Sequence, residues 1–432
     1  MIKRLYIHVP FCASKCGYCA FYSLPSPTPA DIGSYLEKLE QDFKSSSHLC
    51  GKIESIFIGG GTPTFLSADH LIKLFSLINS FFDISASAEI SIECNPETLT
   101  SEKARIIAKF ANRVSLGIQS FNPKFRSILG RQGSVSTIKK AISLLTKNGI
   151  SNIGCDLIYA VPGQSPEDWQ RDLEKAVSLP LKHISAYSLT IEEGTRLAEE
   201  NSKFEIRNPK FENKNNPDTR HQIPDVRRQT TEDRQPIRQA QGKPTTRLHR
   251  KTTPWQADDY SLKMWNLAGT VLKKYGFHRY EISNYAKRGF ECRHNLEIWY
   301  GGKYLGFGPA ASSFDGKKRW TNVSDLEKWL AGAGAEIDLI PPERRAREIF
   351  VMGLRTSQGW NKKYFHRKTG FKTENFNSEL TKCNTGILPV DLKFNLLYDE
   401  LKVRKLIKET DEEIYCTRKG LLLWNEVAES LI

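Results

Sequence analysis

The sequence predicts an α/β fold in which short parallel strands alternate with helices, as in an open, partial six-unit (βα)6 barrel. Strand-like runs rich in Ile and Val are mostly apolar on both faces, which is typical of parallel strands covered by helices. Segments with apolar residues at helical spacing lie between them. Six strand–helix units can be identified, which is too few to close an eight-unit barrel.

The elements follow one another in a regular order. The expected strands are residues 4–9, 55–60, 89–94, 113–118, 153–160 and 183–189. The expected helices are residues 31–43, 68–82, 101–110, 134–149, 165–178 and 260–276. Asn148-Gly149 predicts a helix end and Ser165-Pro166 a helix start. Residues 1–200 and 259–315 would form this core.

The pattern changes beyond residue 315. A helix is expected at 344–356, further helical sequence follows around a short interruption, and a small β element precedes a last helix. We therefore expect a separate, smaller and mostly helical C-terminal domain over residues 316–432.

The basic charge of the chain is concentrated in one segment. Thirteen Lys and Arg against six Asp and Glu in residues 201–257 leave +7, half of the net +14 of the 432 residues. This segment is rich in Asn, Gln, Thr, Pro and Arg, and such a composition cannot bury enough apolar surface to offset its ordering entropy. We predict a disordered insertion over residues 201–258, between the sixth strand and sixth helix. A nucleic-acid partner is not expected, although the insertion could contact RNA weakly.

The sequence offers no membrane span and no secretory signal. No stretch approaches roughly 18 uninterrupted apolar residues, and the N-terminal residues read as a strand. A cytoplasmic location is the expectation, and disulfides are rare there.

Three of the nine cysteines stand together directly after the first strand. Cys12, Cys16 and Cys19 form C-x3-C-x2-C. Three thiolates in eight residues can hold three irons of a 4Fe–4S cluster and leave the fourth iron open. The motif follows the carboxyl end of a strand, where barrel-type folds carry their active sites. The alternative is a zinc site with His8 as fourth ligand.

These residues give the chain a resemblance to a known family. C-x3-C-x2-C after a first strand resembles the radical S-adenosylmethionine proteins, in which the open iron binds the amino and carboxylate groups of S-adenosylmethionine and a 5′-deoxyadenosyl radical results. The further motifs are YIHVPFC, GGGTPTFL, SLGIQSFN, DLIYAVPGQ and EISNYAKRGFECRHN. They resemble the branch that contains oxygen-independent coproporphyrinogen oxidases and HemW-type heme chaperones.

The resemblance implies a set of cofactor-binding residues. Glycines after the second strand allow backbone to approach a ligand closely, and Gly60, Gly61 and Thr62 match the family positions that line the amino-acid part of the cofactor. Polar residues on the other strands and beside the cluster match as well; these are Tyr6, Tyr18, Glu93, Gln119, Arg131 and Asp156. No residue is assigned as catalytic.

The two branches differ at one position in particular. The oxidases carry a fourth cysteine two residues after the third, where this chain has Phe21, and this favours the HemW type. That type is taken to bind heme and deliver it to acceptor proteins, and its cluster requires an electron donor. The HN-x-x-YW motif of the family corresponds here to residues 294–299, which makes His294 the candidate heme ligand, because imidazole is a good axial ligand for heme iron.

Other functions stay open at this point. Three family positions differ, with Ile298 for a tyrosine, and Ser312 and Gly133 for histidines. The first alternative is an oxygen-independent coproporphyrinogen III oxidase, which would decarboxylate propionate side chains. The second is a radical enzyme on another substrate, such as an RNA base, supported only by the charge of the insertion.

Overall fold

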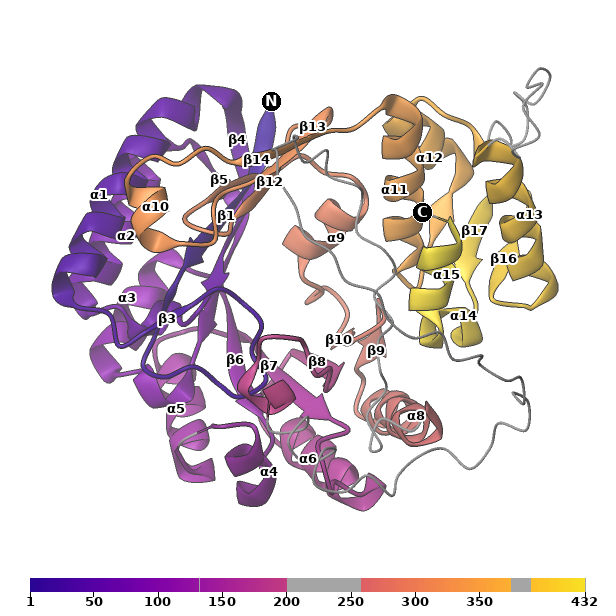
Figure 1. Ribbon diagram of the computed structural model, residues 1–432. Coiled ribbons are helices and arrows are strands. Elements are labelled where there is room, and N and C mark those ends of the chain that lie inside the picture. The colour runs from indigo at the N-terminus through magenta and orange to yellow at the C-terminus, as the bar shows by residue number, and fades with distance from the viewer. Residues whose placement is uncertain (132, 200–257, 374–389, 432) are drawn as a thin grey trace, which may run out of the picture.

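A computed structural model describes residues 1–131, 133–199, 258–373 and 390–431. Figure 1 shows a curved sheet with helices on its outer face on one side of the molecule, and the elements that follow residue 341 on the other side. The predicted insertion, apart from residue 258, lies outside the described residues. None of the helices in the described part of the chain is long and apolar enough to cross a membrane.

The sheet has the order β11-β1-β4-β5-β6-β7-β8-β10-β9 and does not close on itself. Its first seven strands are parallel, and β10 and β9 continue it antiparallel. The predicted open barrel is thus confirmed. Its six predicted strands are β1 (Ile2–Val9), β4 (Cys50–Gly60), β5 (Ile84–Cys94), β6 (Arg113–Gln119), β7 (Asn152–Tyr159) and β8 (His183–Ser188). The added strands are β9 (His278–Arg279), β10 (Asn284–Ala286) and β11 (Leu305–Phe307).

Strands β4 and β5 begin five residues before the predicted starts. Their first residues, CGKIE and ISASA, are mostly polar or small and therefore lack the apolar run used for the prediction. They extend the sheet nonetheless, because Cys50 pairs with Ile2 and Ile53 pairs with Ile84.

The predicted helices cover the outer face of the sheet (Figure 1). Thr28 and Ser165 begin α1 and α6 with capping boxes, in which side chain and backbone exchange hydrogen bonds with Asp31 and Asp168. Gly149 ends α5 with φ +89°, as Asn148-Gly149 predicted. The predicted helices are α1 (Pro29–Ser46), α2 (Ala68–Phe81), α3 (Ser101–Phe110), α5 (Val135–Lys147), α6 (Pro166–Val177) and α8 (Asp258–Lys274), and the short α4 (Pro123–Ile128) was not predicted.

The two faces of the strands differ more than the sequence suggested. On β6, Val114, Leu116 and Ile118 are buried within the hydrophobic core. The alternating residues, from Arg113 to Gln119, face the inside of the half-barrel and line a cavity there. The prediction of strands apolar on both faces was therefore wrong for the inner face, which carries small and polar side chains.

Helix α9 (Arg293–Trp299) lies between the sheet and the C-terminal elements in Figure 1. Buried Glu89 on β5 holds its first turn, since its carboxylate oxygens accept hydrogen bonds from Arg293 N at 3.0 Å and His294 N at 3.1 Å. This contact fixes His294 relative to the sheet.

The C-terminal elements form two groups. The first is a meander of β12 (Ser312–Phe314), β13 (Lys318–Thr321) and β14 (Glu336–Leu339) with α10 (Leu326–Leu330). The predicted boundary at residue 315 directly follows β12. The second group contains the helix predicted at 344–356 and the predicted β element and last helix. Its elements are α11 (Pro342–Leu354), β15 (Trp360–Asn361), α12 (Lys362–Thr369), α13 (Val390–Val403), β16 (Ile407–Glu409), β17 (Glu413–Cys416), α14 (Arg418–Leu422) and α15 (Trp424–Leu431).

Candidate functional site

The three clustered cysteines lie in a loop at the carboxyl end of β1. The loop is held by the short parallel pair β2 (Phe11–Cys12) and β3 (Leu24–Pro25), and Ser26 N donates to Cys12 O at 3.0 Å. Cys12, Cys16 and Cys19 are half-buried, and all three line one cavity of about 480 Å³ inside the half-barrel. The structure thus brings the predicted cluster ligands together at the end of the barrel where we expected them.

The surroundings of the thiols suit an iron–sulfur cluster. Burial raises the pKa of the Cys12 and Cys19 thiols, so iron is needed to keep them as thiolates at neutral pH. Arg131 donates from Nη1 to Cys16 Sγ at 3.7 Å, so a cation lies beside this thiol. Within the described residues, no three His, Cys, Asp or Glu side chains are arranged around a single metal ion. The thiolates of a 4Fe–4S cluster do not have to converge on one ion, because each of them binds a different iron.

His8 is unsuited to the alternative zinc site. Its Nε2 lies 2.9 Å from the carbonyl oxygen of Tyr22, and its Nδ1 lies 3.0 Å from the Tyr6 hydroxyl. A carbonyl only accepts, so Nε2 carries the proton and Tyr6 donates to Nδ1. Both ring nitrogens are therefore occupied.

The glycines after β4 leave room beside the cysteines. A Cβ on Gly61 would lie 2.7 Å from Phe11 O, and Gly60 has φ +108°, a conformation that side chains disfavour. Thr62 Oγ1 lies 3.5 Å from Cys12 Sγ. Gly60, Gly61 and Thr62 line the same cavity as the three thiols, so backbone can approach a bound cofactor there.

Two carboxyl groups face this cavity from β5 and β7. Glu93 accepts a hydrogen bond from Gly60 N at 3.1 Å, and burial followed by the charge of Asp156 raises its pKa to about 8. Burial also raises the pKa of Asp156, whose oxygens accept from Ser115 at 3.2 and 3.3 Å. A cation such as a sulfonium or ammonium group would favour ionisation of both carboxyls.

Gln119 and Arg131 complete this wall of the cavity. Gln119 has φ +69°, and the turn after it is held by Asp172 of α6, which accepts from Ser120 Oγ at 2.5 Å and Phe121 N at 2.9 Å. Arg131 donates from Nη2 to Gly117 O at 2.6 Å and to Asn95 Oδ1 at 2.9 Å.

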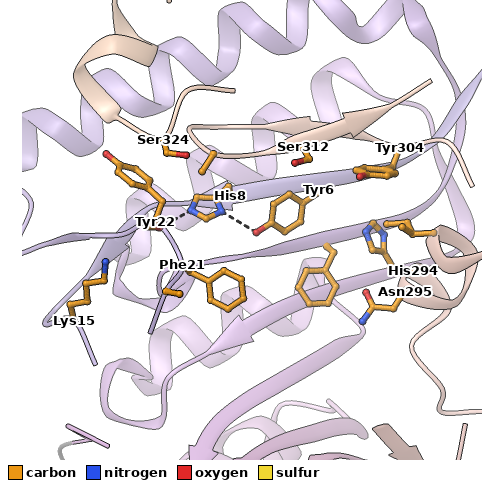
Figure 2. Close-up of a pocket in the computed structure, with 14 residues that line it drawn as sticks. Tyr6, His8, Lys15, Phe21, Tyr22, His294, Asn295, Tyr304, Ser312 and Ser324 are labelled. Carbon is orange, nitrogen blue, oxygen red and sulfur yellow. Dashed lines mark hydrogen bonds between the residues drawn. The ribbon is translucent and has the colours of Figure 1, made fainter. Parts of the chain in front are cut away.

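The two tyrosines predicted beside the cluster lie in different places. Tyr18 lines the cavity of the cysteines. Tyr6 instead lines a second cavity of about 650 Å³, together with His8 and His294 (Figure 2). Phe57 lines this cavity as well. The two cavities adjoin, because Lys15, Phe21, Phe57 and Asn295 line both.

His294 is buried at the wall of the second cavity. Its Nδ1 lies 2.9 Å from Ser55 Oγ, and its ring lies 5.5 Å from that of Phe57. Burial, followed by the charges of Arg4 and Arg113, lowers its pKa to about 3, so the imidazole is neutral at physiological pH. Ser312, which replaces a family histidine, lines the same cavity (Figure 2).

Sequence reasoning missed several residues that line the first cavity. Arg113, His183, Ser185 and Asn284 all face it from the inner side of the barrel. The signal was the alternation of polar residues along β6, where Arg113, Ser115 and Gly117 are two residues apart and precede Gln119.

Comparisons with known proteins agree with this geometry. The radical SAM superfamily model matches residues 6–176. HemW of Bacillus subtilis, named a heme chaperone, is 30% identical over 99% of this chain and 98% of its own length. HemW of Buchnera aphidicola subsp. Acyrthosiphon pisum is 34% identical over 70% of this chain and 68% of its own length. The solved coproporphyrinogen III oxidase HemN of Escherichia coli has the same fold, with a TM-score of 0.73 at 18% identity, over 99% of this chain and 89% of that one.

Family membership implies a 4Fe–4S cluster and S-adenosylmethionine, and the thiols, glycines and carboxyl groups of the first cavity fit both. Relatives aligned over nearly the full length of the chain establish the narrower group. The chain belongs to the HemW family of radical S-adenosylmethionine proteins.

Proposed function

We propose that this protein is a heme chaperone that binds heme beside its 4Fe–4S cluster and S-adenosylmethionine and passes the heme to an acceptor protein. The observation that carries the proposal is the second cavity, in which neutral His294 lies next to the cavity of the cysteines. The full-length similarity to proteins named heme chaperones supports it.

The second cavity has the chemistry that a heme needs. Its aromatic lining includes Tyr6, Phe57 and Tyr304, which offer apolar surface to a macrocycle. His294 keeps Nδ1 on Ser55, an arrangement that orients a metal-binding imidazole and leaves Nε2 for iron. Lys15 is exposed at the edge shared by both cavities and can pair with a propionate.

The cluster would lie in the cavity of the cysteines, next to the proposed heme cavity. The three thiolates would hold it, and its chemistry when bound is electron transfer or reductive cleavage of S-adenosylmethionine. Arg131 donates a hydrogen bond to Cys16 Sγ, while Gly60 and Gly61 give space for the cofactor. We further propose a cytoplasmic location, an electron donor for the cluster and heme-accepting proteins as partners.

Phe21 distinguishes this proposal from an oxidase. It stands where the oxidases carry a fourth cysteine, and its side chain is 68% exposed between the two cavities. A large exposed aromatic residue there suits contact with a flat macrocycle better than it suits metal binding.

Hemin titration of the anaerobically reconstituted protein tests the proposal. We expect a shifted Soret band in the wild type and its loss in His294→Ala. His48→Ala, which changes a histidine outside both cavities, should behave as the wild type. Absence of a Soret shift in the wild type refutes heme binding, and an unchanged spectrum in His294→Ala refutes the assigned ligand. Formation of protoporphyrinogen from coproporphyrinogen III under reducing conditions would favour the oxidase.

A further inference from the structure

The cavity of the cysteines reaches a group of polar side chains deep inside the half-barrel. Arg113 begins β6, His183 begins β8, and Asn284 begins β10 opposite Ser185 of β8. All three line the cavity, and none is among the residues predicted for the cluster or its cofactor. Because the cysteines follow the carboxyl end of β1, the starts of β6 and β8 lie toward the opposite end of the barrel. We call these three residues the barrel-floor group.

Arg113 is a buried cation that forms no direct ion pair, although the charges of Glu89 and Asp156 act on it. It is only 2% exposed and carries five N–H donors, of which Nη1 donates to Ser91 Oγ at the long distance of 3.5 Å. Its buried Nε has no hydrogen-bond partner. Across the residues that the structure describes, no ion pair within 4 Å involves Arg113. Buried charges are normally paired, because removing them from water is costly.

The carboxylates near Arg113 accept hydrogen bonds from groups other than Arg113. Glu89 accepts from the backbone of α9 at 3.0 and 3.1 Å. Asp156 accepts from Ser115, and Glu93 accepts from Gly60 N at 3.1 Å. They lower the electrostatic cost of burying Arg113 but leave its donors available.

His183 presents a second donor beside Arg113. Its Nε2 lies 2.8 Å from the Tyr280 hydroxyl, which accepts from Cys292 N at 3.3 Å. When Tyr280 donates to Nε2, the ring proton of His183 lies on Nδ1, which is buried without a partner. Burial, followed by the charge of Arg113, lowers the pKa of His183 well below its ordinary value. Asn284 Oδ1 is also buried and unpartnered, and its amide can turn to donate instead.

We propose that the barrel-floor group is a binding subsite for the carboxylate of an organic acid that enters from the cysteine end of the cavity. A carboxylate has two acceptor oxygens that match an arginine fork and an adjacent N–H donor. The family resemblance assigns the carboxylate of S-adenosylmethionine to the open iron, so the ligand here is a second molecule. It is a free short acid or, if the proposed function holds, a propionate side chain of heme.

Thermal unfolding in sodium propionate tests the subsite without heme. The full-length reconstituted protein with S-adenosylmethionine is compared in propionate and in chloride at equal ionic strength. We expect propionate to raise the unfolding temperature of the wild type, since a ligand bound only to the folded state stabilises it. Arg113→Gln should weaken propionate binding by about 10- to 100-fold, because bonds to a charged donor are lost. Arg113→Lys should retain part of the affinity.

Arg4→Gln is the matched control. Arg4 is also buried but pairs with Glu297 at 2.6 Å and does not line this cavity. Its loss should leave the propionate response unchanged, whatever its effect on the starting unfolding temperature. A wild type that does not respond to propionate, or an Arg113→Gln variant that responds fully, overturns the subsite.

Hemin and hemin dimethyl ester separate the two sources of the carboxylate. If a heme propionate uses the subsite, the wild type binds hemin about 10- to 100-fold more tightly than the ester, and Arg113→Gln binds both equally. Equal affinities in the wild type overturn the heme source and leave a free acid. If neither heme binds, the proposed function fails, while the propionate measurement still decides the subsite.

Discussion

The buried carboxylate of Asp172 offers a sharp test of how the fold positions the cofactor site. Asp172 is 1% exposed on α6 and accepts hydrogen bonds from Ser120 Oγ at 2.5 Å and Phe121 N at 2.9 Å. These bonds hold the turn in which Gln119 has φ +69°, a conformation that costs a non-glycine residue about 1–3 kcal/mol. Asp172 is thus a positioning residue for Gln119.

Asp172→Ala removes both accepted bonds and leaves the Phe121 N–H buried and unsatisfied. Each bond to a charged acceptor contributes about 1.5–3 kcal/mol. Burial raises the pKa of Asp172, so desolvation of the carboxylate offsets part of the stabilisation from these bonds. We therefore expect Asp172→Ala to lower the free energy of unfolding by about 2–4 kcal/mol. Asp172→Asn keeps an acceptor for Phe121 N and should cost about 1 kcal/mol.

Urea unfolding of the full-length protein gives the free energies, and equilibrium dialysis gives the affinity for S-adenosylmethionine. Asp172→Ala should weaken that affinity, because Gln119 is no longer held in its turn. Asp168→Ala on the same helix loses a helix cap and an ion pair with Arg171 at the surface, neither of which touches the turn at Gln119, and it should bind the cofactor normally. The reasoning is refuted if Asp172→Asn costs as much as Asp172→Ala, or if Asp172→Ala retains full affinity.

Three further predictions concern other parts of the structure. Gly61→Ala should abolish iron incorporation measured by absorbance, because its Cβ would lie 2.7 Å from Phe11 O, whereas Gly33→Ala, with nothing within 4 Å, should incorporate iron normally. The pKa of His294, about 3 in the folded chain against 6.5 ordinarily, contributes stability that is present above pH 6.5 and lost as the pH falls toward 3. Wild-type stability should therefore fall by about 4 kcal/mol more than that of His294→Gln over this range in urea titrations; equal slopes would contradict the assignment. Trp360→Ala, which removes a fully buried ring, should cost about 3–5 kcal/mol of unfolding free energy, and a cost under 1 kcal/mol would contradict that packing.

Local signals were sufficient for the elements and for the cysteine loop. Thr28 and Ser165 begin helices through bonds to Asp31 and Asp168, three residues away, and such contacts are readable along the chain. Cys12, Cys16 and Cys19 converge because they share one loop. The starts of β4 and β5 were missed because pairing with neighbouring strands, and not apolar composition, extends them.

The positions of His294 and Tyr6 depend on long-range contacts, which the sequence does not reveal. Glu89 holds α9 through residues more than 200 positions away, so the fixed place of His294 could not be read locally. Tyr6 was grouped with the cofactor residues, yet its hydroxyl donates to His8 and it lines the neighbouring cavity. The resemblance predicted these residues as one group, but only the folded structure shows which cavity each of them lines.

The inner face of the strands explains why this half-barrel has a cavity. A closed barrel usually fills its interior with branched apolar side chains. Here three strands carry a small serine within their length, namely Ser91 on β5, Ser115 on β6 and Ser185 on β8. These side chains are too small to meet across the interior. Each is buried, and its hydroxyl brings a hydrogen-bonding group to the inner face of the sheet. The cavity that would hold the cofactor at the cysteine end therefore extends to Arg113 at the other end. The same small polar residues leave the space for the cofactor and the space beside Arg113.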